Sequence, residues 1–231
     1  MNKDNHTPLP SAAPNSSIEL HQDGTPIEAI DRPNNTQLHL ASQSCHSSME
    51  DPLLKKGSST EARGGTDNTP LHLAVRSDNT GMTELLLKQG APVGAMDANK
   101  NTPLHLAVNR GNTGMVELLL RQGAPVDAMD GNNSTPLHLA AKIGQTSIVG
   151  LLLSNGASIK ATDKDGNTPL HLAAQSDRTG VVLLLLGKGA SVKIRNKAGY
   201  NPHRLASRNG HAWVEKLFEQ RSWAAKSHGG N

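Results

Sequence analysis

Apolar and polar residues along this chain form a pattern that returns every 33 residues. One copy begins with the letters TPLHLA at 135–140 and continues with an apolar stretch at 148–153. Proline is favoured at the first position of a helix and threonine just before it, so Thr135 and Pro136 predict the start of a short helix. The second apolar stretch predicts another helix, capped by Thr146, with a face that is buried between neighbours.

Glycines and polar residues predict where these helices end. Gly144 follows the first predicted helix and Gly156 follows the second. Glycine adopts the left-handed conformation that ends a helix without steric strain. The stretch 158–167 is polar and rich in turn-forming residues, so we expect a loop or hairpin-like turn there.

Several series of residues hold this register through the chain. The threonines are Thr36, Thr69, Thr102, Thr135 and Thr168, and Asn201 takes the next step. The histidines that follow them are His39, His72, His105, His138 and His171. The glycines are Gly57, Gly90, Gly123, Gly156 and Gly189, and a further series holds Asp31, Asp97, Asp130 and Asp163, with Asn196 next. A period of this length indicates stacked repeats rather than one globular core.

The motif T-P-L-H-x-A together with this period resembles the ankyrin repeat. The resemblance implies an all-α solenoid of stacked helix-turn-helix units joined by hairpin-like turns. It covers about residues 31–221. We expect a degenerate first unit at 31–66, four regular units at 67–198, a C-terminal capping unit at 199–221, a flexible polar N-terminal tail at 1–30 and a C-terminal tail at 222–231.

The flanking units depart from the pattern. Gln37 stands where proline is expected, and Pro52 lies inside the predicted second helix of the first unit, where it would break the helix. That helix is therefore either shortened or frayed. In the last unit His203 replaces a leucine, which suits an outer face in contact with water. Residues 23–27 resemble a repeat start, which leaves open an irregular N-terminal cap.

Composition narrows the functional classes. Aromatic residues make up 2% of the chain, which suits stacked helices with short side chains, and the net charge of +3 is too small by itself to indicate nucleic acid binding. The single cysteine, Cys45, excludes an intramolecular disulfide and stands in the register of helix-ending glycines. The longest aliphatic run, 181–186, is too short to span a membrane. With no secretory signal in the first thirty residues, we expect a cytoplasmic protein, with a nuclear location or delivery into a host cell left open.

The repeated histidines suggest either a metal or catalytic site or a structural role. Equivalent atoms of stacked helices lie roughly 8–10 Å apart, whereas zinc ligands lie about 2 Å from a shared ion, so histidines of successive units do not converge. The resemblance implies that the threonine and histidine of each motif bond each other and nearby backbone. We therefore predict no catalytic residue, no metal ligand and no cofactor.

The resemblance also implies that a partner binds the concave side, formed by the turn tips and first helices. The candidate residues are Arg76, Met96, Asn99, Lys100, Asn109, Arg110, Met129, Asn132, Asn133, Lys142, Ile143, Thr162, Lys164, Asp165, Gln175, Ser176 and Arg195. Exposed apolar residues with a basic rim are typical of protein interfaces. Met96, Met129 and Ile143 are the predicted apolar contacts, and Arg76, Arg110 and Lys142 are predicted to orient the partner.

These features favour a monomeric, non-enzymatic adaptor or inhibitor that binds another protein. An alternative function is a basic module for nucleic acid or anionic lipid. From Lys188 onward the chain has nine lysines and arginines against two acids, although its few aromatic residues give little platform for stacked bases. A third alternative is an ankyrin effector directed at a host cell.

Overall fold

The computed structural model describes residues 35–43 and 58–227, and of residues 221–227 it gives the backbone alone. All regular structure in these ranges is helical, and the helices come in pairs joined by turns, as the sequence predicted. The chain divides into two compact units, 1–103 and 104–231. Within the described residues, no helix is both long and apolar enough to cross a membrane.

The first unit contains three described helices, and a fourth starts at its last residue. They are α1 (Gln37–Gln43), α3 (Pro70–Arg76) and α4 (Thr80–Lys88). Helix α3 packs against both α1 and α4. Leu38, Leu71 and Leu86 are 0% exposed, so the core of this unit is built from aliphatic side chains.

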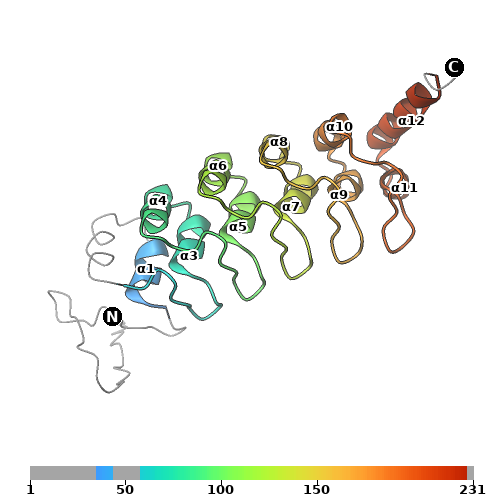
Figure 1. Ribbon diagram of the computed structural model, residues 1–231. Helices are drawn as coiled ribbons and strands as arrows, with labels where there is room; N and C mark the ends of the chain where they lie inside the picture. The colour runs from blue at the N-terminus through green and yellow to red at the C-terminus, as the bar shows by residue number, and fades with distance from the viewer. Residues whose placement is uncertain (1–34, 44–57, 228–231) are drawn as a thin grey trace, which may run out of the picture. The chain divides into compact units, whose positions relative to one another are not determined.

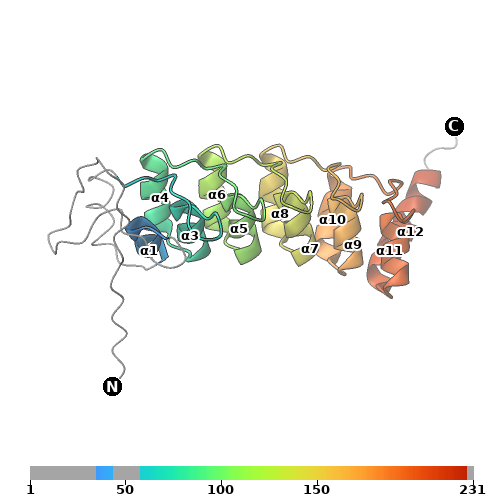
Figure 2. The ribbon, with the colours of Figure 1, turned by 90° about the horizontal axis from the view of Figure 1, so that it is seen from below.

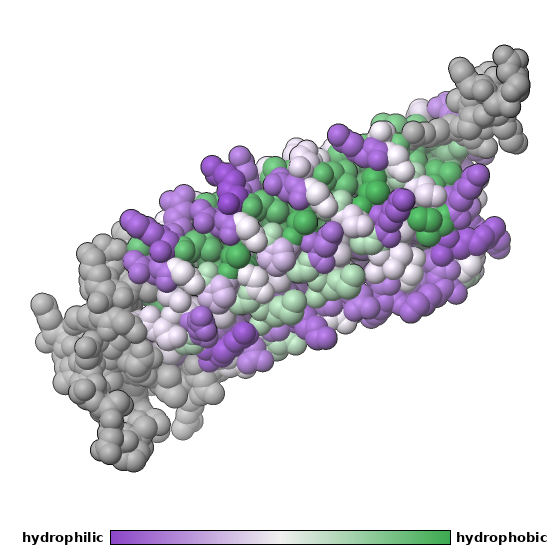
Figure 3. All heavy atoms as spheres, in the orientation of Figure 1, coloured by the Kyte–Doolittle hydropathy of each residue, from purple (hydrophilic) through white to green (hydrophobic). Residues whose placement is uncertain are grey.

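The second unit repeats the same pair of helices. Its helices are α5 (Pro103–Arg110), α6 (Thr113–Arg121), α7 (Pro136–Ile143), α8 (Thr146–Ser154), α9 (Pro169–Gln175), α10 (Thr179–Gly187), α11 (Pro202–Arg208) and α12 (Ala212–Ser227). Helices α7, α9 and α11 lie side by side in one row, α8 and α10 lie in a second row, and the turns between repeats project beyond the first row (Figures 1 and 2). Along the edge formed by these turns, side chains are mostly hydrophilic (Figure 3).

The first helix of each regular repeat starts as the motif predicted. Thr135 has φ −86° and ψ 165° and lies just outside α7, and Pro136 is the first helical residue. The Thr135 side chain accepts a hydrogen bond from the backbone N–H of His138, and the imidazole accepts one from the Thr135 N–H. This reciprocal capping box satisfies two backbone donors that a helix otherwise leaves unpaired.

Each second helix begins one residue earlier in the chain than the sequence predicted. Thr146 and its counterparts are the first helical residues, so the prediction that they are caps is wrong. The cap positions belong to Asn79, Asn112, Gln145 and Arg178. The Asn79 side chain accepts the Met82 N–H at 3.0 Å, and Asn112 accepts the Met115 N–H at 2.8 Å. Gln145 and Arg178 make no such bond, so α8 and α10 start without a side-chain cap.

Residues with positive φ end the helices and shape the turns. Gly144 has φ 97° and Gly156 has φ 87°, which confirms that both are helix-ending glycines. A separate series occupies the turn tips, where Lys100 and Asn133 have φ of 61° and 56°, and Gly166 stands at the next equivalent position with φ 76°. Residues other than glycine disfavour this conformation, so contacts with the surrounding structure must stabilise the backbone of Lys100 and Asn133.

The C-terminal end differs from the prediction in length. Helix α12 continues to Ser227, so residues 222–227, which the sequence analysis assigned to a C-terminal tail, are helical. The sequence there contains two alanines and has no glycine before Gly229, so nothing breaks the helix earlier. His203 on α11 is partly exposed and packs near Phe218, with 5.8 Å between ring centroids.

Three predictions concern residues outside those that the structure describes. They are the flexible tail at 1–30, the broken helix at Pro52 and the turn at Cys45.

Candidate functional site

The histidine of each TPLH motif bonds to its own repeat on one side and to the next repeat on the other. His138 Nδ1 accepts the Thr135 N–H at 3.2 Å and lies 2.9 Å from Thr135 Oγ1. Because Nδ1 accepts a hydrogen bond, the ring proton is on Nε2. Nε2 donates that proton to the Asn167 carbonyl at 3.0 Å. Both ring nitrogens are therefore used, and neither is open to a metal or a substrate.

The same forward bond recurs along each unit. In the first unit His39 and His72 reach the carbonyls of Asn68 and Asn101 at 2.9 and 3.1 Å. In the second unit the pairs are His105 with Ser134 at 3.1 Å and His171 with Tyr200 at 3.1 Å. Each acceptor lies 29 residues ahead of its histidine. This geometry confirms the structural interpretation of the histidines and adds a link between neighbouring repeats that the sequence did not reveal.

Burial favours the neutral form of three of these imidazoles. It lowers the pKa of His72, His138 and His171 below the ordinary value of 6.5. The carbonyl that accepts the Nε2 proton opposes this shift without cancelling it. A neutral, fully buried imidazole with both nitrogens bonded is a structural group and not a general acid or base.

Aspartate side chains bond the backbone of the turn tips, which carry several of the predicted partner-binding residues. One carboxylate oxygen of Asp130 accepts the backbone N–H groups of Asn132 and Ser134 at 2.7 and 2.8 Å. Asp97 and Asp163 make the equivalent pair of bonds in their own turns. The regular series of aspartates seen in the sequence therefore folds the turns and does not form an acidic binding site.

The residues predicted to bind a partner lie almost entirely on the surface. All of them are exposed except Ser176, which is half-buried at the C-terminal end of α9. Met96, Met129 and Ile143 are 41%, 46% and 39% exposed. They are three of the five large hydrophobic residues exposed in the described chain, the others being Leu183 and Trp213. Met96 belongs to the first unit, and Met129 and Ile143 belong to the second.

Only some candidate residues contact one another. In the second unit Lys164 Nζ donates to the Asn132 side chain at 2.7 Å, and its backbone N–H donates to the Asn132 carbonyl at 2.9 Å. These bonds join two successive turn tips into one surface. In the first unit the guanidinium of Arg63, a residue that the sequence analysis did not select, donates to the Met96 carbonyl. Arg76 donates to the Asn68 side chain at 3.2 Å.

The last repeat contains a cluster of one aromatic and two basic residues that the sequence analysis did not predict. The guanidinium carbons of Arg204 and Arg208 lie 5.2 and 5.1 Å from the centre of the Tyr200 ring, and Arg208 donates to the tyrosine hydroxyl at 2.6 Å. Together with Ser207 they line a shallow depression. The signal in the sequence was the spacing of four between Tyr200, Arg204 and Arg208, which places them along one side of a helical start.

A comparison with family models gives overlapping matches to one model, described as ankyrin repeats in three copies. The matched residues are 38–130, 71–163, 113–196 and 137–226. The matches extend over most of the chain and through both compact units, which confirms the resemblance noted in the sequence. A search of curated proteins found no match.

Proposed function

Because the chain belongs to the ankyrin-repeat family, whose members are generally protein–protein interaction modules, we propose that it is a non-enzymatic adaptor or inhibitor. It binds a partner protein through the turn tips and first helices of its repeats. The histidines and the turn aspartates, which are the framework residues capable of chemistry, are already bonded within the fold. Binding therefore depends on the exposed residues that vary between repeats.

The exposure of Met96, Met129 and Ile143 is the observation that supports this proposal best. Large apolar side chains gain free energy when a partner removes them from water, about 25 cal/mol for each Å² of buried apolar surface. Methionine is also flexible enough to fit an irregular partner surface. Exposed cations at Arg110 and Lys142 would orient an acidic partner and raise its association rate.

The test is a triple variant, Met96→Asp, Met129→Asp and Ile143→Asp, in the full chain. Partners captured from the native cell type by the wild type would be identified by mass spectrometry and their affinities measured with purified proteins. We expect the triple variant to weaken binding at least about a hundredfold, because three apolar contacts of roughly 1 kcal/mol or more are lost and charges are desolvated. Its circular dichroism spectrum should equal that of the wild type, because all three side chains are exposed.

Leu183→Asp is the matched control. Leu183 is 52% exposed but lies on α10, a second helix, away from the turn tips. If Leu183→Asp weakens binding and the triple variant does not, the binding surface lies on the second helices and the proposal is wrong.

The cluster at Tyr200 favours a second candidate function, binding of nucleic acid or anionic lipid by the C-terminal repeat. Its two guanidinium groups would attract phosphate, but they already lie over the tyrosine ring and so compete with stacked bases for it. Double-stranded DNA, single-stranded RNA and vesicles containing phosphatidylserine are suitable probes. Binding that falls by orders of magnitude between 50 and 200 mM salt and is lost in Arg204→Ala/Arg208→Ala would support it.

A further inference from the structure

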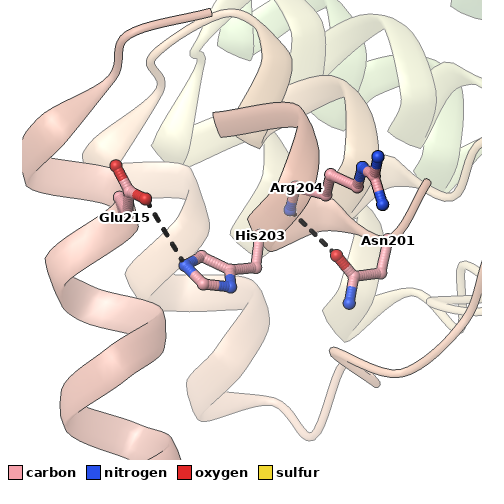
Figure 4. Close-up of polar contacts among 4 residues, drawn as sticks. All are labelled: Asn201, His203, Arg204 and Glu215. Carbon is pink, nitrogen blue, oxygen red and sulfur yellow. Dashed lines mark hydrogen bonds and ion pairs between the residues drawn. The ribbon is translucent and has the colours of Figure 1, made fainter. Parts of the chain in front are cut away.

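Three residues of the last repeat bring metal-binding atoms together between α11 and α12. His203 lies on α11, and Glu215 and Glu219 lie one turn apart on α12, so both carboxylates are on the same side of that helix. One nitrogen of His203 and one oxygen of each glutamate all lie within 4.8 Å of one another. Figure 4 shows His203 and Glu215 pointing toward one another from the two helices.

The imidazole nitrogen that faces the carboxylates has no hydrogen bond. His203 Nε2 is shielded from solvent, although the side chain as a whole is 40% exposed through its other atoms. It lies 3.9 Å from Glu215 Oε1, which is too far for a hydrogen bond. Shielded polar atoms are nearly always bonded in folded proteins. A cation held between this nitrogen and the two carboxylates would supply the missing partner.

The register of the repeats shows that all three positions are special to the last repeat. The residues equivalent to His203 are Leu71, Leu104, Leu137 and Leu170, and those equivalent to Glu219 are Leu87, Leu120, Leu153 and Leu186. The residues equivalent to Glu215 are Thr83, Val116, Val149 and Val182, all of which are 0% exposed. A terminal repeat needs polar residues on its outer face, but any polar residue meets that need. One imidazole and two carboxylates with ligand atoms within 4.8 Å of one another form a specific set of ligands.

We propose that His203, Glu215 and Glu219 bind one divalent transition-metal ion of the zinc class. Zinc takes imidazole nitrogen and carboxylate oxygen at about 2.0–2.2 Å, which puts ligand atoms of a tetrahedral site about 3.4 Å apart. The observed 3.9 Å between Nε2 and Oε1 reaches this value with a small side-chain movement. Calcium and magnesium prefer all-oxygen sites, so the imidazole selects against them. Three protein ligands leave one position for water, and the bound ion ties α12 to α11.

The experiment uses Co²⁺ and Zn²⁺ as probes on the full chain. Co²⁺ should bind with one saturable equivalent and give the visible absorption of a four-coordinate nitrogen and oxygen site, and Zn²⁺ should displace it. Zn²⁺ should also raise the melting temperature. Saturable binding that does not depend on His203, or no saturable equivalent at all, would overturn the proposal.

Two variants and a control make the result specific among the eleven histidines of the chain. His203→Leu restores the residue found in the other repeats, so it should fold normally, as circular dichroism will show, and lose the cobalt spectrum. Glu219→Gln removes one charged ligand with little change in shape and should weaken Zn²⁺ binding at least about tenfold. Glu117→Gln, an exposed glutamate on α6, should bind as the wild type does. Equal weakening in Glu117→Gln and Glu219→Gln would show general surface attraction and also exclude the site.

Discussion

In a regular repeat and in the last repeat alike, a proline is the first residue of the first helix, but the two helices are capped differently. In the regular repeat, Thr135 and His138 bond each other, and His138 continues to a carbonyl of the next repeat at 3.0 Å. In the last repeat Asn201 accepts the Arg204 N–H at 2.8 Å, and the Arg204 guanidinium lies over the Tyr200 ring (Figure 4 for the first contact). The asparagine serves one helix, whereas the imidazole couples two repeats. This difference indicates that the histidines couple the folding of adjacent repeats.

Acid should break this comparison most strongly, because it acts on several regular repeats at once. Burial lowers the pKa of His72, His138 and His171 below 6.5, so below that pH the unfolded chain binds more protons than the folded chain. Stability is therefore complete above about pH 6.5 and is lost as the pH falls toward the lowered pKa values. Each histidine contributes up to about 1.4 kcal/mol per pH unit, so the three together lose up to about 4 kcal/mol between pH 7.5 and 5.5.

Urea unfolding followed by circular dichroism at pH 7.5, 6.5 and 5.5 will measure this loss. His138→Gln should show a shallower dependence on pH, because one titrating group is gone. A free energy of unfolding that stays constant from pH 7.5 to 5.5 would contradict the role given to burial.

Replacing the imidazole of one regular repeat is the next largest change. His138→Ala removes a fully buried side chain, leaves the Thr135 N–H without its acceptor and the Asn167 carbonyl without its donor. Unsatisfied buried groups cost about 1–3 kcal/mol each, so we expect a loss of about 3 kcal/mol in urea unfolding. Arg204→Ala, at the equivalent position of the last repeat, should cost less than about 1 kcal/mol, since only an exposed cation–π contact is lost. Equal losses for the two variants would show that the histidine does not couple repeats.

A variant at Asn201, the cap of α11, tests whether this cap stabilises only its own repeat. Asn201→Ala removes the acceptor of the Arg204 N–H and should lower the free energy of unfolding by about 1 kcal/mol, as is usual for a lost helix cap. Asn201→Asp keeps an acceptor at the same place and serves as the control. Hydrogen exchange should show that the loss in Asn201→Ala is confined to α11 and α12. Increased exchange in α7 would contradict a purely local role.

The sequence predicted the regular parts of the fold because each repeat states the same local rules again. Proline after threonine and glycine after an apolar stretch are sufficient to place α7 between Thr135 and Gly144. The second helices were misplaced by one residue because Asn79 and Thr80 are both good cap residues, and the invariant threonine was the more visible of the two. The extra length of α12 was missed because the regular repeats set the expected length of a second helix, and α12 has 16 residues against nine in α8 and in α10.

The candidate site was predictable only as far as exposure. Positions that escape the repeated pattern face solvent, so Met129 and Ile143 could be found by their register. The proximity of His203 to Glu215 and Glu219 could not be predicted in the same way. It depends on the packing of α11 against α12, at positions where the repeat pattern predicts apolar residues. The identity of a partner depends on the shape of the exposed surface, which no repeating motif encodes.

The smallest effect comes from giving the last repeat the motif of the others. The double change Asn201→Thr and Arg204→His writes T-P-H-H in place of N-P-H-R and restores the reciprocal cap between the two residues. In each described regular repeat, however, the histidine Nε2 also donates to a carbonyl 29 residues ahead, just before the first helix of the next repeat, and among the described residues α12 continues to Ser227 with no further first helix after it. The new imidazole would therefore gain a cap and lose the cation–π contact of Arg204, and we expect urea unfolding to change by less than about 0.5 kcal/mol. A gain of 2 kcal/mol or more would mean that the threonine–histidine pair stabilises a repeat without a neighbour, and the forward bond would then be a consequence of stacking rather than a cause of it.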